Sequence, residues 1–515
     1  MIPVFSTSAM RAIDHSTING DITTGYSLML EAGMGLFEEA KKMISFRDGA
    51  SITVFCGKGN NGGDGYVAGK MLLEAGYSVM CYSLCELEAL TGEAKIALNE
   101  YLARKGNVLV INEVEDIEAL SSCDLIIDAI LGTGIKGDPH GLCAAVIHRI
   151  NVSGMPVLSV DTPSGLNCDN GVPGNPCVKA KATVTMGFPK LGLLFAPGKA
   201  YVGKLVTKNL GYPEENVVEN SESVFCAVAE QMHKILPQRK QFGAKFEHGL
   251  ALMVCGSRGM SGAATLSSTA AMRIGCGMVH LAIPQSLLDV MSTKVTEPVL
   301  HPVSETSSGT PSADSLKEIV NLLKGKNAIC IGPGISHHPQ TSVMVRELVK
   351  GVNVPAVLDA DGLNAFVGHT DELKEHGGEL LITPHRGEWK RLFGQLSAEP
   401  SEIIKKLRAV ASDFNLTILL KGNPTIVVEN TGKVIIAPFG NSALATAGSG
   451  DVLSGIIVSL IAQGASVVDS AILGQFVFGE AGTMAAGDLT EYSVMAGDIP
   501  SYIPRIIKRI VESDV

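Results

Sequence analysis

The chain reads Ala445-Thr446-Ala447-Gly448-Ser449-Gly450-Asp451 near its C-terminus, and an apolar run at helical spacing, 456–462, follows. Gly448 and Gly450 let the backbone adopt positive φ and bring its amides close to a ligand. A helix that begins here presents unpaired N–H groups and the positive end of its dipole, which together favour a bound anion. Asp451 fits two roles. It could cap the helix, a preference worth about 1 kcal/mol, or it could act on a ligand bound there, and this stretch alone leaves both open.

The composition is that of a glycine-rich α/β enzyme with more than one domain. The chain has 515 residues, 46% of them hydrophobic and 18% charged, with 57 glycines. A single core does not grow to this size, so two or three domains are expected. The net charge of −11 argues against a nucleic-acid-binding protein, which usually carries a basic excess.

The cysteines and the hydropathy pattern indicate a compartment. The 11 cysteines form no C-x-x-C pair, and none follows Cys330. Scattered cysteines in a long chain are typical of reduced thiols, so neither a disulfide framework nor a zinc cluster is expected. Because the N-terminus lacks the pattern of a signal peptide and no 18-residue apolar stretch occurs, we expect a cytoplasmic protein without a membrane span.

A glycine-rich loop follows the first strand of a predicted doubly wound sheet. The β-type run 51–56 is followed by Gly57-Lys58-Gly59-Asn60-Asn61-Gly62-Gly63-Asp64-Gly65 and then by a predicted helix over 66–74. A strand, a glycine-rich loop and a helix form the phosphate-binding corner of such sheets. The loop matches neither G-x-G-x-x-G nor a Walker motif. A tight turn needs only one or two glycines and this loop has five, so ligand binding is the favoured interpretation.

Two later strands also end in polar loops. The run 125–129 contains Asp128 and leads into Leu131-Gly132-Thr133-Gly134, and the run 156–160 leads into Asp161-Thr162-Pro163-Ser164-Gly165. Ligands of open α/β sheets bind at the carboxyl ends of the strands, so Asn61, Asp128 and Ser164 could converge there. Their oxygen atoms suit a hard cation better than zinc.

A second α/β sheet is predicted after an acidic, polar stretch at 213–223, and we place the domain boundary near residue 220. Its strands are expected at 249–255, 328–331, 356–358, 380–382 and 417–420, and each ends in a polar loop. Taken alone, His385 is more often a helix cap or a turn residue, and Lys421 a solvated surface cation. Their shared position directly after buried strands favours a function for both.

The first half resembles the NAD(P)H-hydrate epimerase family. The resemblance covers roughly residues 1–215 and rests on the loops 59–65, 128–134 and 161–165 in this order, together with Phe188-Pro189-Lys190-Leu191-Gly192. It implies a Rossmann-like epimerase domain over 1–219 and a K⁺ held by Asn61, Asp128 and Ser164. It also implies that the hydrated nucleotide is bound by Asn60, Asn61, Gly62, Gly63, Asp64, Gly132, Thr133, Gly134, Ile135, Lys136, Gly137, Asp138 and Asp161, with Asp161 as a proton-transfer residue.

The second half resembles the ADP/ATP-dependent NAD(P)H-hydrate dehydratases, which are ribokinase-like proteins. The resemblance covers about 225–510 and rests on 256–264, Gly332-Pro333-Gly334, Thr383-Pro384-His385, Lys421-Gly422 and Gly448-Ser449-Gly450-Asp451. It implies that the substrate is bound by Ala263, Gly334, His385 and Asp451, with Asp451 as catalytic base. The adenine nucleotide, with Mg²⁺, would be bound by Lys421, Gly422, Asn423, Pro424, Thr425 and Gly450.

Together the two halves resemble the bifunctional NAD(P)H-hydrate repair enzymes. This implies an isomerase and a hydro-lyase in one chain, with small-molecule partners only, in a homo-oligomer. ADP is the favoured donor over ATP because the fused domain order resembles that of bacterial and archaeal members. The alternative is a ribokinase-like vitamin or sugar kinase fused to a non-catalytic nucleotide-binding module, because the fold alone does not fix function.

Overall fold

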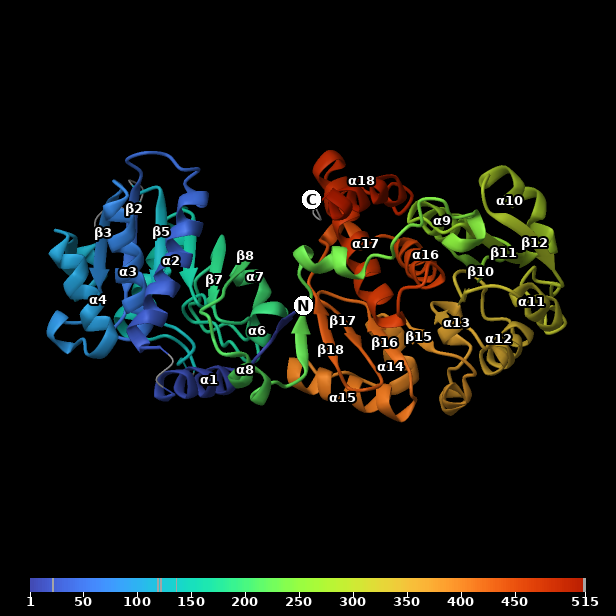
Figure 1. Ribbon diagram of the computed structural model, residues 1–515, viewed down its shortest axis with the longest axis horizontal. Coiled ribbons are helices and arrows are strands. Elements are labelled where there is room, and N and C mark those ends of the chain that lie inside the picture. Colours follow the sequence, from blue (N-terminus) through green and yellow to red (C-terminus); the bar gives the residue numbers. More distant parts are fainter. Residues whose placement is uncertain (21–22, 118–119, 121–122, 136, 513–515) are drawn as a thin grey trace. The chain divides into compact units, whose positions relative to one another are not determined.

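The computed structural model describes residues 1–20, 23–117, 120, 123–135 and 137–512. The chain divides into two compact units, one formed by residues 2–224 and the other by Met1 and residues 225–515 (Figure 1). Both units are α/β, as the sequence predicts, and each is described here by itself.

The first unit is a parallel sheet with helices on both faces. Its strands are β2 (Ser51–Cys56), β3 (Ser78–Ser83), β4 (Asn107–Val110), β5 (Leu125–Ala129), β6 (Val157–Val160), β7 (Ala182–Met186) and β8 (Lys204–Lys208). They are ordered β4-β3-β2-β5-β6-β7-β8, and every neighbouring pair is parallel. Strands β5, β6 and β7 are buried along their whole length, as expected for a sheet covered on both sides.

The helices of this unit are α1 (Thr7–Asn19), α2 (Gly25–Met43), α3 (Asn60–Glu74), α4 (Gly92–Ala103), α5 (Gly141–Val152), α6 (Leu191–Leu194), α7 (Lys199–Val202) and α8 (Glu214–Glu219). Helix α2 buries Leu28, Ala32, Leu36 and Ala40, which recur every fourth residue and therefore share one face. Helices α2, α3 and α4 pack in one hydrophobic cluster with the sheet, and α5 packs in another.

Helix α3 begins six residues earlier than the sequence analysis expects, at Asn60 rather than Tyr66. The helix can begin at this glycine-rich segment because its glycines pack closely against neighbouring residues, where a larger side chain would not fit. A Cβ atom on Gly65 would lie 2.7 Å from the Cβ of Ala129, and one on Gly62 would lie 2.0 Å from the carbonyl oxygen of Gly57. The glycine-rich segment is therefore the first turns of a helix pressed against the sheet, not a loop in front of it.

The second unit is built on a mixed sheet. Its strands are β9 (Val224–Cys226), β10 (Leu250–Val254), β11 (Met278–Pro284), β12 (Val299–Val303), β13 (Ala328–Ile331), β14 (Ala356–Leu358), β15 (Leu380–Ile382), β16 (Thr417–Leu420), β17 (Thr425–Val428) and β18 (Val434–Ala437). The order is β9-β18-β17-β16-β15-β14-β13-β10-β11-β12. The strands from β10 to β16 are parallel to one another, whereas β17 is antiparallel to both β16 and β18.

Its helices are α9 (Ser261–Arg273), α10 (Leu288–Lys294), α11 (Ser315–Leu323), α12 (Pro339–Gly351), α13 (Asp361–Asn364), α14 (Arg386–Phe393), α15 (Pro400–Asp413), α16 (Ser449–Ala462), α17 (Val467–Leu489) and α18 (Ile499–Glu512). Helices α9, α16 and α17 lie over one face of the sheet, and α12 to α15 lie toward the other (Figure 1). Among the described residues, no helix is long and apolar enough to cross a membrane.

Helix α16, the predicted anion-binding helix, is buried along most of its length. Every residue from Val452 to Ala462 is buried. It approaches α9 so closely that a Cβ atom on Gly455 would lie 2.0 Å from the carbonyl oxygen of Ser267. Ser459 Oγ donates a hydrogen bond of 2.9 Å to the carbonyl oxygen of Ala271 on the same helix. Glycine and serine thus allow the two helices to touch through their backbones.

Candidate active sites

A cavity of about 670 Å³ lies at the carboxyl ends of β2, β5 and β6 in the first unit. Eight of the predicted substrate-binding residues line it, namely Asn60, Asn61, Asp64, Gly132, Thr133, Gly134, Ile135 and Asp161. The parallel sheet therefore brings together segments that are about 100 residues apart in the chain, at the strand ends where ligands of α/β sheets bind.

The other predicted residues of this set lie elsewhere. A Cβ atom on Gly62 would meet the backbone of Gly57, and one on Gly63 would meet Met29 and Ala94, so both glycines serve helix packing. Asp138 Oδ1 accepts a hydrogen bond of 2.9 Å from the backbone N–H of Asn175. Neither Gly137 nor Asp138 lines the cavity, and Lys136 lies outside the described residues.

Asp161 forms a buried ion pair inside the cavity. Its Oδ1 atom accepts hydrogen bonds from Lys190 Nζ at 2.5 Å, from the backbone N–H of Met186 at 3.0 Å and from Thr185 Oγ1 at 3.2 Å. The backbone of Asp161 has φ +61°, a strained value for a residue other than glycine. Only 2% of the Lys190 side chain is exposed, and its ammonium also donates to Thr185 Oγ1 and to the Met186 carbonyl. Three hydrogen bonds to Asp161 Oδ1 thus fix the carboxylate of the pair.

Two further aspartates, Asp14 and Asp64, line the same cavity. The hydroxyl group of Tyr212 donates a hydrogen bond of 2.5 Å to Asp14 Oδ1, and burial raises the pKa of Asp14. Burial also raises the pKa of Asp64 well above its ordinary value, and the charges of Asp161 and Asp14 add to this effect. The cavity is thus lined by three aspartates, and by Glu93, beside the buried ammonium of Lys190.

The sequence analysis missed Asp14, Lys190 and Tyr212. Lys190 had a signal, because it stands in the Phe188-Pro189-Lys190 segment that carries part of the resemblance. Asp14 has none, since it occupies an ordinary amphipathic helix whose buried face holds Met10 and Ile13.

The three predicted cation ligands lie near the same strand ends. Asp128 is fully buried, and its carboxylate accepts hydrogen bonds from Ser164 Oγ (2.5 Å), from the Ser164 backbone N–H (2.9 Å) and from Ser159 Oγ (2.9 Å). Burial raises the pKa of Asp128, and the hydrogen bonds from Ser164 oppose this rise. Among the described residues, no lysine or arginine pairs with this carboxylate, and the buried Asn61 Nδ2 has no hydrogen-bond partner.

This donor set fits a hard cation. The available ligands are carboxylate, hydroxyl and amide oxygens, and no group of three or more His, Cys, Asp or Glu side chains suited to a metal occurs in the described part of the chain. A buried carboxylate without a cationic partner gains from a bound cation. The chemistry of the residues is therefore compatible with K⁺ and not with a soft transition metal.

In the second unit, Asp451 lies in the first turn of α16. The preceding Gly448 adopts a left-handed conformation with φ +88°, which allows the sharp entry into the helix. Burial raises the pKa of Asp451 to about 7, the negative charges of Asp359 and Asp361 add to the rise, and the ammonium of Lys421 opposes it. A carboxyl group with this pKa can exchange a proton near neutral pH.

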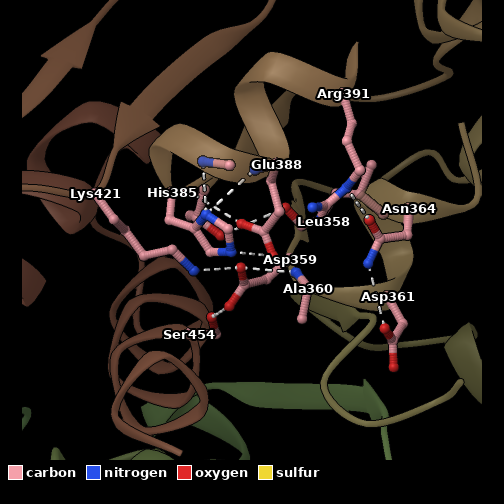
Figure 2. Close-up of polar contacts among 12 residues, drawn as sticks. Leu358, Asp359, Ala360, Asp361, Asn364, His385, Glu388, Arg391, Lys421 and Ser454 are labelled. Atoms are coloured by element: carbon pink, nitrogen blue, oxygen red, sulfur yellow. Dashed lines mark hydrogen bonds and ion pairs between the residues drawn. The ribbon is translucent and has the colours of Figure 1, made fainter. Parts of the chain in front are cut away.

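Lys421 and Asp359 form a second buried ion pair, which Figure 2 shows beside α16. Lys421 Nζ donates to Asp359 Oδ1 at 2.7 Å, and Ser454 Oγ donates to Asp359 Oδ2 at 2.5 Å. The Asp359 side chain is only 1% exposed. Lys421 is therefore no solvated surface cation, and its ammonium lies 3.3 Å from where a Cβ atom on Gly450 would be.

The remaining nucleotide-binding candidates form the turn between β16 and β17. Thr425 Oγ1 donates to the carbonyl oxygen of Gly422 at 3.2 Å and closes the segment 421–425. Because Lys421 begins this turn and approaches Gly450, the predicted nucleotide residues meet at one place.

His385 caps helix α14. Its Nδ1 atom accepts from the backbone N–H groups of Gly387 (2.9 Å) and Glu388 (3.2 Å), and Glu388 Oε2 accepts from the His385 backbone N–H at 2.8 Å (Figure 2). The capping role that the sequence left open is thus present. It fixes the imidazole ring one strand away from Lys421, with which His385 forms a parallel bridge.

Ala263 and Gly334 are neighbours. A Cβ atom on Gly334, which has φ +65°, would lie 2.7 Å from the Cβ of Ala263, and Ser257 Oγ donates to the Gly334 carbonyl at 2.8 Å. The residue that the sequence analysis missed in this unit is Asp359. Its segment after β14 was recognised as a strand-end loop, but nothing in the sequence showed which carboxylate faces Lys421.

Comparisons with known proteins agree with two kinds of unit in one chain. A family described as NAD(P)H-hydrate dehydratase matches residues 251–505, and one described as YjeF-related protein N-terminus matches residues 25–192. A bifunctional NAD(P)H-hydrate repair enzyme of Moorella thermoacetica is 38% identical over 491 residues, which cover 94% of this chain and 93% of that protein. The enzyme of the same name from Escherichia coli is 30% identical over 485 residues, covering 94% and 90%.

The chain also resembles solved structures. One is an ADP/ATP-dependent NAD(P)H-hydrate dehydratase from Bacillus subtilis, co-crystallised with ATP and Mg²⁺. It is 25% identical, covers 56% of this chain and 100% of its own, and has a TM-score of 0.48.

Proposed function

The chain belongs to the family of bifunctional NAD(P)H-hydrate repair enzymes, and from this premise we propose how its two units divide the work. The protein is an NAD(P)H-hydrate epimerase and dehydratase. Residues 1–219 interconvert the R and S forms of the hydrate. Residues 225–510 dehydrate the S form to NAD(P)H and consume ADP or ATP.

Asp451 is the base of the dehydration. It takes the proton of the ring hydroxyl group as the hydroxyl oxygen attacks the terminal phosphate of the adenine nucleotide, and AMP (from ADP) or ADP (from ATP) leaves with the bridging oxygen. The N–H groups at the start of α16 and the ammonium of Lys421 hold the negative charge of the transferring phosphoryl group. Phosphate then leaves the ring with the hydroxyl oxygen, and loss of a proton from the adjacent carbon restores the double bond. The pKa of Asp451, about 7, carries this assignment because a base works best near the ambient pH.

The substrates occupy the two sides of this base. The hydrated nucleotide binds against Ala263, Gly334 and His385, and the adenine nucleotide binds against residues 421–425 and Gly450. Mg²⁺, when bound, neutralises charge on the nucleotide phosphates. The chain's own task is to place Lys421 and the α16 amides against these phosphates.

In the epimerase unit, Asp161 moves the proton of the ring hydroxyl group during opening and closing at that carbon. Lys190 holds the Asp161 carboxylate in place. K⁺ would be held by Asn61, Asp128 and Ser164, where it supplies positive charge near the strand ends. Asn60, Asp64 and the segment 132–135 bind the nucleotide, because they line one cavity with Asp161.

The test uses a mixed pool of R and S hydrates. We expect the absorbance of NADH to recover completely when the protein is given ADP or ATP with Mg²⁺, because epimerisation feeds the S form to the dehydratase. Recovery of only the S share would remove the epimerase assignment. Accumulation of a phosphorylated alcohol without NADH would favour the kinase alternative.

A second measurement separates the nucleotide site. ADP or ATP at a hundredfold excess over its dissociation constant stabilises the unit that binds it by about 2.7 kcal/mol. We expect this rise in thermal stability only for the transition of the second unit. An unchanged melting temperature with millimolar nucleotide and Mg²⁺ would contradict the assignment of 421–425.

A further inference from the structure

Asp359 has no part in the substrate contacts assigned above, yet it has the densest set of polar contacts near Asp451. It follows β14 directly and its side chain is 1% exposed. It accepts hydrogen bonds from Lys421 Nζ, Ser454 Oγ and the backbone N–H of Ala360, at 2.7, 2.5 and 2.8 Å. A buried carboxylate is costly unless it is paired and hydrogen-bonded, and all three partners serve this purpose.

These contacts connect Asp359 to the face of α16 that carries Asp451. Ser454 follows Asp451 by three residues, so the two side chains lie on the same face of the helix. A Cβ atom on Gly450 would lie 3.9 Å from Asp359 Oδ2 and 3.3 Å from Lys421 Nζ. The carboxylate therefore holds the ammonium of Lys421 against the first turn of α16 (Figure 2).

We propose that Asp359 is a positioning residue of the dehydratase, which fixes Lys421 where the nucleotide phosphate arrives and keeps Asp451 a usable base through its negative charge. The proposal rests on the function proposed for Asp451. It adds that a carboxylate outside the substrate contacts controls both ends of the proton and phosphoryl transfer.

The charges around Asp451 agree with this role. Asp359 after β14 and Asp361 at the start of α13 raise the pKa of Asp451, and Lys421 after β16 lowers it. The negative charge of Glu388 on α14 favours a higher pKa for Lys421. The charge of Asp451 itself favours a higher pKa for the buried Cys330 thiol on β13. Removing the charge of Asp359 removes one charge that raises the pKa of Asp451 and leaves the opposing charge of Lys421 in place, so the pKa of Asp451 falls.

The test is the pH profile of kcat/KM for dehydration in Asp359→Asn, with ADP and Mg²⁺. We expect the acidic limb of the profile to move to lower pH by about one unit or more, because a nearby charge shifts a pKa on this scale. The KM for ADP should rise at least about tenfold, because Lys421 loses its anchor and a factor of ten costs only about 1.4 kcal/mol. Epimerisation by the same chain reports whether the first unit is intact.

Asp361→Asn is the matched control. Asp361 also raises the pKa of Asp451, but it accepts hydrogen bonds from the Ser336 backbone N–H and from Asn364 instead of Lys421. We therefore expect its acidic limb to move while the KM for ADP stays near that of the wild type. Asp371→Asn, at a fully exposed position, should change neither quantity.

A double variant keeps the proposal testable if Asp359→Asn does not fold. Asp359→Asn with Lys421→Met removes both charges, and a neutral replacement of a buried ion pair often restores stability. Its acidic limb should return toward that of the wild type, because one charge that raises the pKa of Asp451 and one that lowers it are lost together.

A fall in dehydration with an unmoved acidic limb would overturn the proposal, because a purely structural role predicts that result. If the single variant cannot be measured, the double variant is used instead. The expected result is then an acidic limb near that of the wild type, because both charges are lost, together with a raised KM for ADP. An unchanged KM there would overturn it. Absence of dehydration in the wild-type chain with both nucleotides would instead reject the proposed function itself.

Discussion

Each unit contains one buried aspartate–lysine pair at its proposed site, but the two pairs differ in which carboxylate the lysine holds. In the first unit Lys190 binds Asp161, the proposed proton-transfer residue itself, at 2.5 Å. In the second unit Lys421 binds Asp359 at 2.7 Å and leaves Asp451 without an ion-pair partner among the described residues. The aspartate–lysine pair thus includes the proposed reacting carboxylate in the first unit and lies beside it in the second.

The difference matters because the two reactions ask different things of a carboxylate. Dehydration needs a base that takes a proton once per turnover, and a free carboxylate with a pKa of about 7 suits this. In the epimerisation proposed above, a ring opens and recloses at one carbon, so the carboxylate must keep its position while the substrate turns. We infer that the hydrogen bonds to Asp161 fix its position and that the lack of an ion-pair partner suits Asp451 to taking a proton.

The largest expected effect is that of Asp451→Asn. Asparagine keeps the size and the helix-capping ability of aspartate, so the fold should remain. Dehydration should fall at least about 100-fold, the lower range for loss of a general base. Epimerisation, followed by chromatography of the R and S forms, should stay at the wild-type rate. Near-normal recovery of NADH would break the comparison, because Asp451 would then not be the base, and the N-cap residue of α16 is Gly448 rather than Asp451.

Lys190→Met should damage only the first unit. It leaves Asp161 as an unpaired carboxylate, and breaking a buried pair costs about 3–5 kcal/mol. We expect epimerisation to fall at least about tenfold, a fraction of the roughly 10²–10⁴ that an acid–base group contributes, and the first unit to melt earlier. Dehydration of pure S hydrate should not change. Lys181→Met, at an exposed position, is the control, and equal loss in both variants would contradict the clamp.

Asp128→Ala should weaken the response to K⁺. In the wild type we expect K⁺ to raise both epimerase activity and the melting temperature. Bound K⁺ increases the free energy of unfolding by RT ln(1 + [K⁺]/Kd), which is about 2.7 kcal/mol at a hundredfold excess. The variant should lose this thermal shift, and Asp48→Ala, at an exposed position, should keep it. Full epimerase activity of the wild type without K⁺ and Na⁺ would exclude the cation.

The smallest effect sharpens the comparison through stability alone. Because the pKa of Asp451 is raised to about 7, the folded chain binds more protons than the unfolded chain between about pH 4 and 7. The free energy of unfolding of the wild type therefore falls as the pH rises through this window. Asp451→Asn lacks this titrating group, so its free energy of unfolding does not show this contribution to the fall. We expect the variant to gain about 2 kcal/mol relative to the wild type between pH 5 and pH 8, since one pKa unit is worth about 1.4 kcal/mol. Parallel pH profiles from denaturant melts would contradict the raised pKa.

Much of the fold could be predicted from local patterns. Continuous apolar runs such as 125–129 and 417–420 indicate buried parallel strands, and the structure confirms the α/β class of both units. The start of α3 could not be predicted, because glycines disfavour helices locally and only the close packing of Gly62 and Gly65 overrides this preference.

The sites were predictable where a residue follows a strand directly and not where it comes from a distant element. Asp161 and Lys421 are of the first kind, and Asp451 is marked by the crowded small residues at the start of α16. Asp14 reaches its cavity from α1, and Tyr212 reaches it from a segment almost 200 residues later. Their pairing depends on how α1 packs, which no periodicity in the sequence shows.

The close contact between α9 and α16 has a consequence for motion. Gly455 leaves no room between the helix backbones, and Ser459 bonds them together. Ala263 and Asp451 occupy the first turns of these two helices, so the wall formed by them should move as one rigid body. Opening to admit substrate or release product must then come from the strand-end loops that carry Gly334, His385 and Lys421. We expect the amide protons of 264–273 and 452–462 to exchange together, at the rate of global unfolding of this unit, while those of the opposing loops exchange faster.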